Sequence, residues 1–282
     1  MKTVQVNNGV EIPILGFGVY QIPAEKTEQA VIDAIKAGYR HIDTAQSYMN
    51  ETEVGLGIKN SGIAREELFI TTKIWIENVS YNGVMSSFQG SLNRLGIDYV
   101  DLLLIHQPYN DVYGAWRAME ELQKEGKIRA IGISNFAVDR AVDLSLFNEV
   151  TPAINQIEIN PFNQQTEAIE ALKAEGICLE AWAPFAEGKN EIFQNEILSE
   201  IGKKYNKSVA QVILRWLVEQ EIVVLAKTTN PERMAENIDV FDFSLTDEDK
   251  TAIATLNIGE SQFFSHADPN MIKMLAERKL GL

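Results

Sequence analysis

Hydrophobic and polar positions along this chain alternate between two patterns. Short apolar runs of strand length recur from the N-terminal part of the chain to its last fifth, and stretches with helical periodicity separate them. We expect strands at "ILGFG", "RHIDT", "LFITTK", "VDLLLIH", "IRAIGIS", "AINQIEI", "ICLEAWA" and "IVVLAK".

The separating stretches place apolar residues on one face of a helix. In "EQAVIDAIKAG" the residues on that face are Ala30, Val31, Ala34 and Ile35. In residues 83–96 they are Val84, Met85, Phe88, Leu92 and Leu95. Gly38 and Gly96 follow the last turns, where glycine commonly ends a helix. "AWRAMEELQKEG", "QTEAIEALKAEG" and "SVAQVILRWLVEQ" have the same pattern.

Eight strands, each followed by a helix, in about 250 residues predict a (β/α)8 TIM barrel. The alternative is a doubly wound open sheet, which is disfavoured because no linker, composition shift or G-x-G-x-x-G motif after a strand is present. We therefore expect a single barrel domain over residues 1–282. "TVQV-NNG-VEIPI" predicts an N-terminal β-hairpin that closes the bottom of the barrel. The chain after residue 257 has no strand to pair with, and we expect this C-terminal tail over the barrel mouth.

Composition narrows the class of partner. The net charge of −15 argues against nucleic acid and against an anionic membrane surface. No apolar run approaches the roughly 18 residues of a membrane-spanning helix. The single cysteine, Cys178, excludes an internal disulfide and fits a reducing compartment. We expect a cytoplasmic monomer that acts on a small molecule.

Polar residues stand where several predicted strands end, the face that carries the active site in such barrels. Asp43, Lys73 and His106 end the second, third and fourth strands, and Tyr48 follows the second. Taken singly, Asp43 could be a helix cap, His106 a core residue and Tyr48 a packing residue. Their convergence on one end of the barrel indicates an active site. A buried Lys needs a partner such as Asp43, and a Tyr beside it is expected to have a pKa lowered from about 10. With a His, that Tyr is a proton source for a carbonyl oxygen. His106 is the only imidazole among these groups, and we therefore expect no metal site.

Residues 227–237, "KTTNPERMAEN", predict an anion site. Asn230 suits a helix N-cap and Pro231 the first helical position. The start of a helix presents unpaired N–H groups and a partial positive charge, and here Lys227 and Arg233 adjoin it.

The chain resembles the aldo-keto reductases, and within them the bacterial 2,5-diketo-gluconic acid reductase group. "GYRHIDTAQSYMNE", "GSLNRLGIDYVDLLLIHQP" and "LAKTTNPERMAENIDVFDFSL" are similar to the three signatures of that family, in the same order. "GISNF" and "INQIEINPF" match it as well, so that the resemblance extends from the hairpin to about residue 266.

The resemblance implies reduction of aldehydes or ketones by hydride transfer from NADPH. Tyr48 would be the general acid, Lys73 and Asp43 the pair that tunes it, and His106 the group that orients the carbonyl. The residues implied in cofactor binding are Ser134, Asn135, Gln156, Trp182, Lys227, Thr228, Thr229, Arg233, Glu236 and Asn237. Among them, Lys227, Thr228, Thr229 and Arg233 would hold the 2′-phosphate. The backbone of residues 183–185 would pass the pyrophosphate, although "APFAEG" departs from the commoner Ser-Pro-Leu-Gly.

The substrate pocket implied by the resemblance contains Tyr20, Trp75 and His106, with Phe263 and Phe264 of the tail as further candidates. This apolar lining suits a small aldehyde or ketone. Gln107 stands where many relatives carry Trp, which makes the wall beside His106 smaller and more polar.

Two other functions stay open. Lys73 could form a Schiff base in an aldolase, since barrels with a strand-end Lys often carry this chemistry. The barrel could also be a non-catalytic nucleotide sensor, against which the complete set of Asp43, Tyr48, Lys73 and His106 argues.

Overall fold

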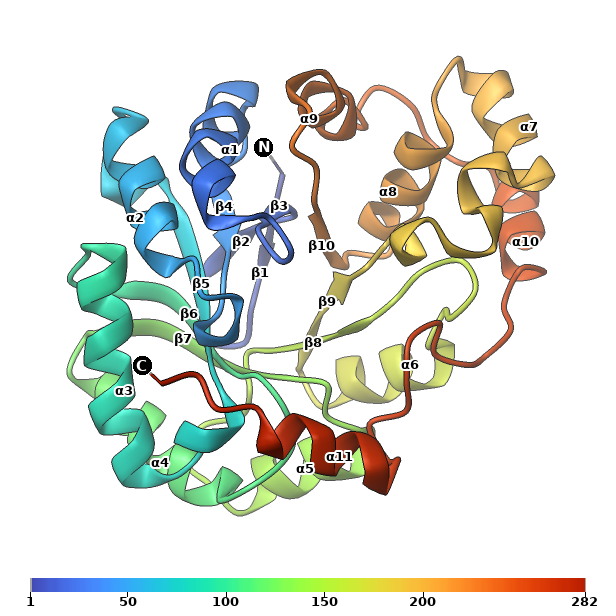
Figure 1. Cartoon of the computed structure of the whole chain (residues 1–282). Helices are drawn as coiled ribbons and strands as arrows, with labels where there is room; N and C mark the ends of the chain where they lie inside the picture. Colours follow the sequence, from blue (N-terminus) through green and yellow to red (C-terminus); the bar gives the residue numbers. More distant parts are fainter. Residues whose placement is uncertain (1, 282) are drawn as a thin grey trace.

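Eight parallel strands close into a barrel at the centre of the computed structural model, which describes residues 2–281 (Figure 1). Around the barrel they follow in the order β10-β3-β4-β5-β6-β7-β8-β9. Their bounds are β3 Leu15–Gly18, β4 His41–Asp43, β5 Phe69–Ile74, β6 Val100–Ile105, β7 Ile128–Ser134, β8 Ile154–Glu158, β9 Cys178–Trp182 and β10 Val223–Ala226. The expected fold and all eight expected strands are confirmed.

Helices surround this barrel and shield the outward faces of its strands (Figure 1). Their bounds are α1 Ala24–Ala37, α2 Glu51–Asn60, α3 Tyr81–Leu95, α4 Val112–Lys124, α5 Val138–Leu146, α6 Thr166–Ala174, α7 Glu196–Tyr205, α8 Val209–Glu219, α9 Pro231–Ile238, α10 Asp247–Ala254 and α11 Pro269–Glu277. The predicted apolar faces of α1 and α3 are buried, except that Met85 is only partly buried. Gly38 and Gly96 end these helices in the left-handed conformation, with φ of 112° and 64°.

The N-terminal hairpin closes the amino end of the barrel. Strands β1 (Thr3–Gln5) and β2 (Glu11–Pro13) pair antiparallel, with Val4 opposite Ile12. Ile12 packs in one cluster with Phe69 and Val223, the first residues of β5 and β10. The hairpin therefore fills the end of the barrel from which the strands start, as the sequence predicted.

The C-terminal tail crosses the opposite end. Tyr109 Oη donates to the backbone oxygen of His266 at 2.6 Å, and Trp75 Nε1 donates to that of Arg278 at 2.9 Å. These bonds fasten the tail, including the unforeseen helix α11, to loops that follow β5 and β6. The expected position over the mouth is confirmed. No helix among the residues described is long and apolar enough to span a membrane.

Candidate active site

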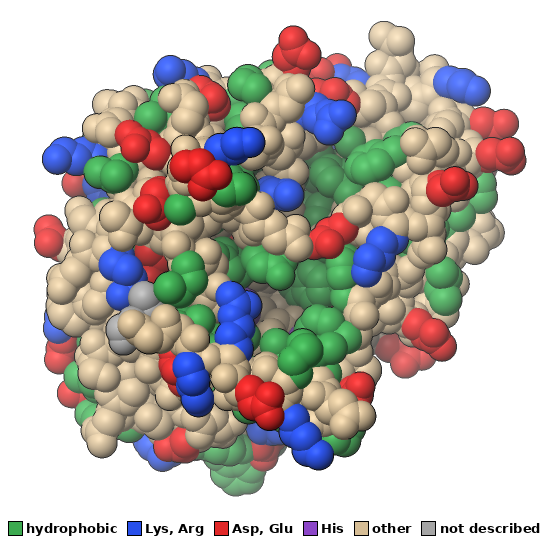
Figure 2. Space-filling view, viewed as in Figure 1, with side chains coloured by type: hydrophobic (Ala, Val, Ile, Leu, Met, Phe, Trp, Pro, Cys, Tyr) green, Lys and Arg blue, Asp and Glu red, His purple; other side chains and the backbone are tan. Residues whose placement is uncertain are grey.

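The carboxyl ends of the strands and the tail enclose a cavity of about 340 Å³. Figure 2 shows a hollow in this face of the molecule, walled largely by hydrophobic side chains. The predicted residues that line the cavity are Tyr20, Asp43, Tyr48, Trp75, His106, Ser134, Asn135, Gln156, Trp182, Ala183, Pro184, Phe185, Lys227, Phe263 and Phe264. Lys73 is fully buried beneath them.

Tyr48 lies in a loop that the barrel holds firmly. A 3-10 turn, Gln46–Tyr48, places it beside the end of β4. The side chain of Asn50 accepts a hydrogen bond from Thr44 Oγ1 at 3.0 Å and donates one to the backbone oxygen of Val19 at 3.1 Å. Because Asn50 is itself buried, these bonds fix the course of the loop and with it the position of the phenol.

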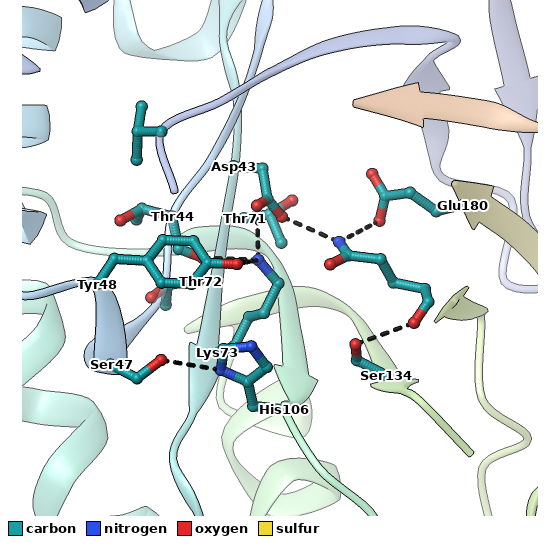
Figure 3. A network of polar contacts seen from close by, with 12 residues as sticks. Asp43, Thr44, Ser47, Tyr48, Thr71, Thr72, Lys73, His106, Ser134 and Glu180 are labelled. Carbon is teal, nitrogen blue, oxygen red and sulfur yellow. Dashed lines mark hydrogen bonds and ion pairs between the residues drawn. The ribbon is translucent and has the colours of Figure 1, made fainter. Parts of the chain in front are cut away.

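Lys73 is the centre of the polar network at the cavity floor (Figure 3). Its Nζ donates to Asp43 Oδ1 at 2.5 Å, to the backbone oxygen of Thr44 at 3.1 Å and to Tyr48 Oη at 3.2 Å. Burial is the largest single influence and disfavours the ammonium ion, but the charge of Asp43, the nearby Tyr48 and the hydrogen bonds to both together outweigh it and raise the pKa of Lys73. Lys73 is therefore charged at neutral pH, with an acceptor for each of its three protons.

The expectation that Tyr48 has a lowered pKa is wrong. Burial disfavours the phenolate and raises the pKa of Tyr48. The positive charge of Lys73 offsets this only in part, because the negative charge of Asp43 acts in the opposite direction, and the pKa of Tyr48 rises to about 12. The sequence indicated the neighbouring cation but not the depth of burial. Because Lys73 donates to the phenol oxygen, the proton of Tyr48 points away from Lys73. Tyr48 is thus a protonated group at neutral pH, and it lines the cavity.

His106 stands next to Tyr48, with its ring edge-on to the phenol and the ring centroids 5.6 Å apart. Its Nδ1 lies 3.3 Å from Ser47 Oγ (Figure 3). Burial and the positive charges of Lys73 and Arg278 lower the pKa of His106 well below its ordinary value. The imidazole is therefore neutral at neutral pH. If the Ser47 hydroxyl donates to Nδ1, the other nitrogen, Nε2, carries the proton.

Four of the predicted cofactor residues form a hydrogen-bonded chain at the ends of β7, β8 and β9. Ser134 Oγ donates to the backbone oxygen of Gln156 at 2.9 Å, and Asn135 Nδ2 donates to Ser134 Oγ at 3.1 Å. Trp182 Nε1 donates to Asn135 Oδ1 at 2.9 Å. This chain orients the Trp182 ring in the cavity wall.

The predicted anion corner forms as a capped helix. Asn230 caps α9, and its side chain accepts from the N–H groups of Glu232 at 2.8 Å and Arg233 at 3.2 Å. These two N–H groups are consequently satisfied, contrary to the expectation that they are unpaired. The side chains of Lys227 and Arg233 are exposed, and within residues 2–281 neither pairs with a carboxylate. Thr229 is also exposed, Thr228 and Glu236 are half-buried, and Asn237 is buried.

The predicted substrate residues flank Tyr48 and His106. The ring of Tyr20 lies 4.9 Å from that of Tyr48, and the ring of Trp75 lies 5.4 Å from that of His106. Gln107 lines the same cavity, and its Oε1 is buried without a hydrogen-bond partner in the described part of the chain. The wall beside His106 is therefore polar, in line with the sequence-based expectation for this position.

Three further tail residues line the cavity: His266 belongs to the stretch "SQFFSHADP" that sequence reasoning placed in the pocket, whereas Leu275 and Arg278 were missed. Arg278 Nη2 donates to the backbone oxygen of Ser47 at 2.5 Å, and its guanidinium carbon lies 5.4 Å from the centroid of the Trp75 ring. Among residues 2–281 no carboxylate pairs with Arg278. The only available signal was the cationic end of a tail expected over the mouth.

Glu180 was overlooked as well. It stands in the middle of the predicted strand "ICLEAWA" and is fully buried inside the barrel. A carboxyl group in an apolar strand run was itself a signal, because a buried carboxyl group needs a hydrogen-bond partner.

Comparison with known proteins places these features in a family. The model of the aldo/keto reductase family matches residues 15–258. Glyoxal reductase of Bacillus subtilis is 48% identical over 260 residues, which cover 92% of this chain and 94% of the relative.

Two solved structures extend the likeness to three dimensions. A Bombyx mori aldo-keto reductase in complex with NADP superposes with a TM-score of 0.90 at 35% identity, covering 96% of each chain. A putative 2,5-diketo-D-gluconic acid reductase B superposes with a TM-score of 0.87 at 38% identity, covering 91% of this chain and 92% of that one. The chain therefore belongs to the aldo/keto reductase family, whose members are oxidoreductases of small carbonyl compounds.

Proposed function

We propose that this protein reduces small aldehydes and ketones to alcohols, with NADPH as the hydride donor and Tyr48 as the general acid. The observation that carries the proposal is the contact of the protonated Tyr48 phenol with the Lys73 ammonium, 3.2 Å apart, beside the neutral His106. NADPH would supply a hydride to the carbonyl carbon. The residues of the chain then have to bind the carbonyl oxygen and give it a proton.

The geometry suits that task. A carbonyl oxygen that accepts from Tyr48 Oη and from an Nε2–H of His106 gains two donors at the point where negative charge develops. As negative charge develops on this oxygen, Tyr48 would give it the proton that completes the alcohol. Lys73 stabilises the phenolate that remains, and Asp43 keeps Lys73 in place. Solvent then returns a proton to Tyr48.

The cavity also offers groups that fit a nicotinamide cofactor. Gln156 and Asn135 present amide groups that can bind the carboxamide, and the wall contains the ring of Trp182, on which a flat nicotinamide can stack. Residues 183–185 line the cavity next to Trp182, where their backbone could approach the pyrophosphate.

The preference for NADPH over NADH is assigned to the side chains of Lys227 and Arg233, with the hydroxyls of Thr228 and Thr229. The two cations are exposed and make no ion pair with any residue between 2 and 281, although the chain has a net charge of −15. A guanidinium binds phosphate oxygens through two parallel hydrogen bonds. Glu236 and Asn237, one turn further along α9, would adjoin the adenine.

The aldolase alternative is disfavoured by the state of Lys73. A Schiff-base lysine attacks as a neutral amine, whereas Lys73 is buried, paired with Asp43 and has a raised pKa. A nucleotide sensor would bind NADPH as the proposed reductase does, but it would not turn over a carbonyl substrate.

One experiment separates these functions. NADPH oxidation is followed by absorbance over a panel of aldehydes, ketones and keto-sugars, and NADPH binding is titrated by fluorescence. We expect binding with turnover, and a large loss of turnover in Tyr48→Phe. Binding without turnover on the whole panel would favour the sensor. Trapping of a substrate on Lys73 by borohydride would favour the aldolase.

A further inference from the structure

The side chain of Gln156 joins two carboxyl groups inside the barrel. Its Nε2 donates to Asp43 Oδ2 at 3.0 Å and to Glu180 Oε2 at 2.9 Å (Figure 3). The register of β8 and β9 sets Gln156 directly beside Glu180. Glu180 is completely buried, and its other oxygen, Oε1, has no hydrogen-bond partner in the described chain. Among the hydrogen bonds of residues 2–281, Gln156 is therefore the link between Glu180 and the pair Asp43–Lys73.

The two carboxyl groups decide which way the Gln156 amide faces. An amide that lies between two acceptors presents its NH2 group to them, since its oxygen would be repelled. The oxygen Oε1 must then point the other way, and Gln156 lines the cavity. Nothing among residues 2–281 donates a hydrogen bond to this oxygen, which is consistent with an acceptor kept for a ligand.

The charges of the network leave Glu180 neutral. Asp43 has Lys73 as its cation, and a second buried carboxylate would be unpaired. His41 Nε2 lies 3.8 Å from Glu180 Oε1, but burial lowers the pKa of this imidazole to about 3, so it adds no positive charge. Burial and the nearby Asp43 raise the pKa of Glu180 to about 8. Glu180 is thus a carboxylic acid at neutral pH.

We propose that Glu180 is a positioning residue for the cofactor: it accepts a hydrogen bond from Gln156 and, together with Asp43, aims the Gln156 carbonyl oxygen at the carboxamide NH2 of the nicotinamide. This inference rests on the proposed function. It links the pair Asp43–Lys73, which serves the proton transfer, to the amide that holds the hydride donor. A single glutamine then sets the cofactor ring relative to Tyr48.

Two substitutions separate this role from simple core packing. Glu180→Gln keeps a neutral group with an acceptor oxygen, so NADPH affinity should stay within about threefold of wild type. Glu180→Leu removes one of the two acceptors and leaves the amide held by Asp43 alone. Loss of one hydrogen bond should raise the Kd for NADPH about two- to tenfold. Thermal unfolding of both variants confirms that they are folded.

A cofactor analogue makes the test specific. In the 3-acetylpyridine analogue of NADPH a methyl ketone replaces the carboxamide, so that no NH2 is present for Gln156. We expect Glu180→Leu to weaken binding of NADPH but not of the analogue, whereas Glu180→Gln should weaken neither. Equal losses for both cofactors in Glu180→Leu would refute the proposal and indicate a packing role, as would an unchanged NADPH affinity. A wild-type protein that binds no NADPH would instead refute the proposed function.

Discussion

Replacing Lys73 with Met removes the cation that stands between Asp43 and Tyr48. Lys73 is completely buried, and three contacts of its Nζ, at 2.5, 3.1 and 3.2 Å, are lost together. Met has an unbranched side chain of similar length, so the packing around the lysine stem should persist. The variant therefore tests the charge of Lys73 and not its volume.

The stability of the variant should depend on pH. Leaving one partner of a buried ion pair unpaired costs about 3–5 kcal/mol, and Asp43 can relieve part of this cost by taking up a proton. The pKa of Asp43 in the folded variant should then lie above its unfolded value. A group of this kind stabilises the fold below its unfolded pKa, and this contribution is lost as the pH rises through the folded pKa. Lys73→Met should thus be closer to wild type at pH 5 than at pH 8.

The catalytic loss should be larger than the loss of cofactor affinity. Lys73 donates to the phenol oxygen on which negative charge appears when the proton leaves. Removal of one such donor costs about 10²–10³ in kcat, or about 2.7–4 kcal/mol. The Kd for NADPH should change little, because Lys73 lies beneath the cavity and does not line it.

The assay is single-turnover NADPH oxidation, combined with urea unfolding at pH 5 and pH 8. The matched control is the double variant Asp43→Asn/Lys73→Met, which replaces both charges by neutral groups. It should regain most of the stability but none of the rate. A single variant that keeps more than a tenth of the wild-type kcat, with chemistry shown to be rate-limiting, would refute the role of Lys73. A double variant as unstable as the single one would refute the electrostatic explanation.

Three further predictions address other parts of the site. Tyr48→Phe should lower kcat by about two to four orders of magnitude while NADPH binding stays near normal, and a fall of less than tenfold in single turnover would assign the proton to another group. Arg233→Ala should raise the Kd for NADPH about ten- to hundredfold and leave the Kd for NADH nearly unchanged, and this difference should shrink as the salt concentration rises. Fluorescence titration measures both dissociation constants, and Lys59→Ala on α2 is the control. Equal losses of affinity for the two cofactors would mean that Arg233 only supports the helix. Arg278→Ala should raise KM for aldehydes that carry a carboxylate relative to neutral ones of similar size, since Arg278 lines the cavity without a carboxylate partner between residues 2 and 281. Lys279→Ala, which removes the neighbouring charge, should leave that ratio unchanged, and a similar change in both variants would speak against a direct contact.

The local pattern of the sequence was sufficient for the architecture. Continuous apolar runs and one-sided helical faces are direct consequences of burial on both faces of a barrel strand and on one face of a surrounding helix. Strand ends then placed Asp43, Lys73 and His106 on one rim, because parallel strands all finish on the same side. The helix cap at Asn230 could also be predicted from the sequence, because the start of a helix depends on residues that are neighbours along the chain.

The tertiary structure alone decided what depends on distance and burial. The sequence indicated that Tyr48 adjoins a cation, but the sign of its pKa shift follows from the balance of desolvation, Lys73 and Asp43, which requires their depth and separation. Arg278 reaches the cavity from a tail more than two hundred residues away from Ser47, a contact that no local pattern encodes. Glu180 meets Gln156 because β8 and β9 pair in one particular register. Charges and amides acquire their roles from neighbours across the barrel, and only the closed fold brings those neighbours together.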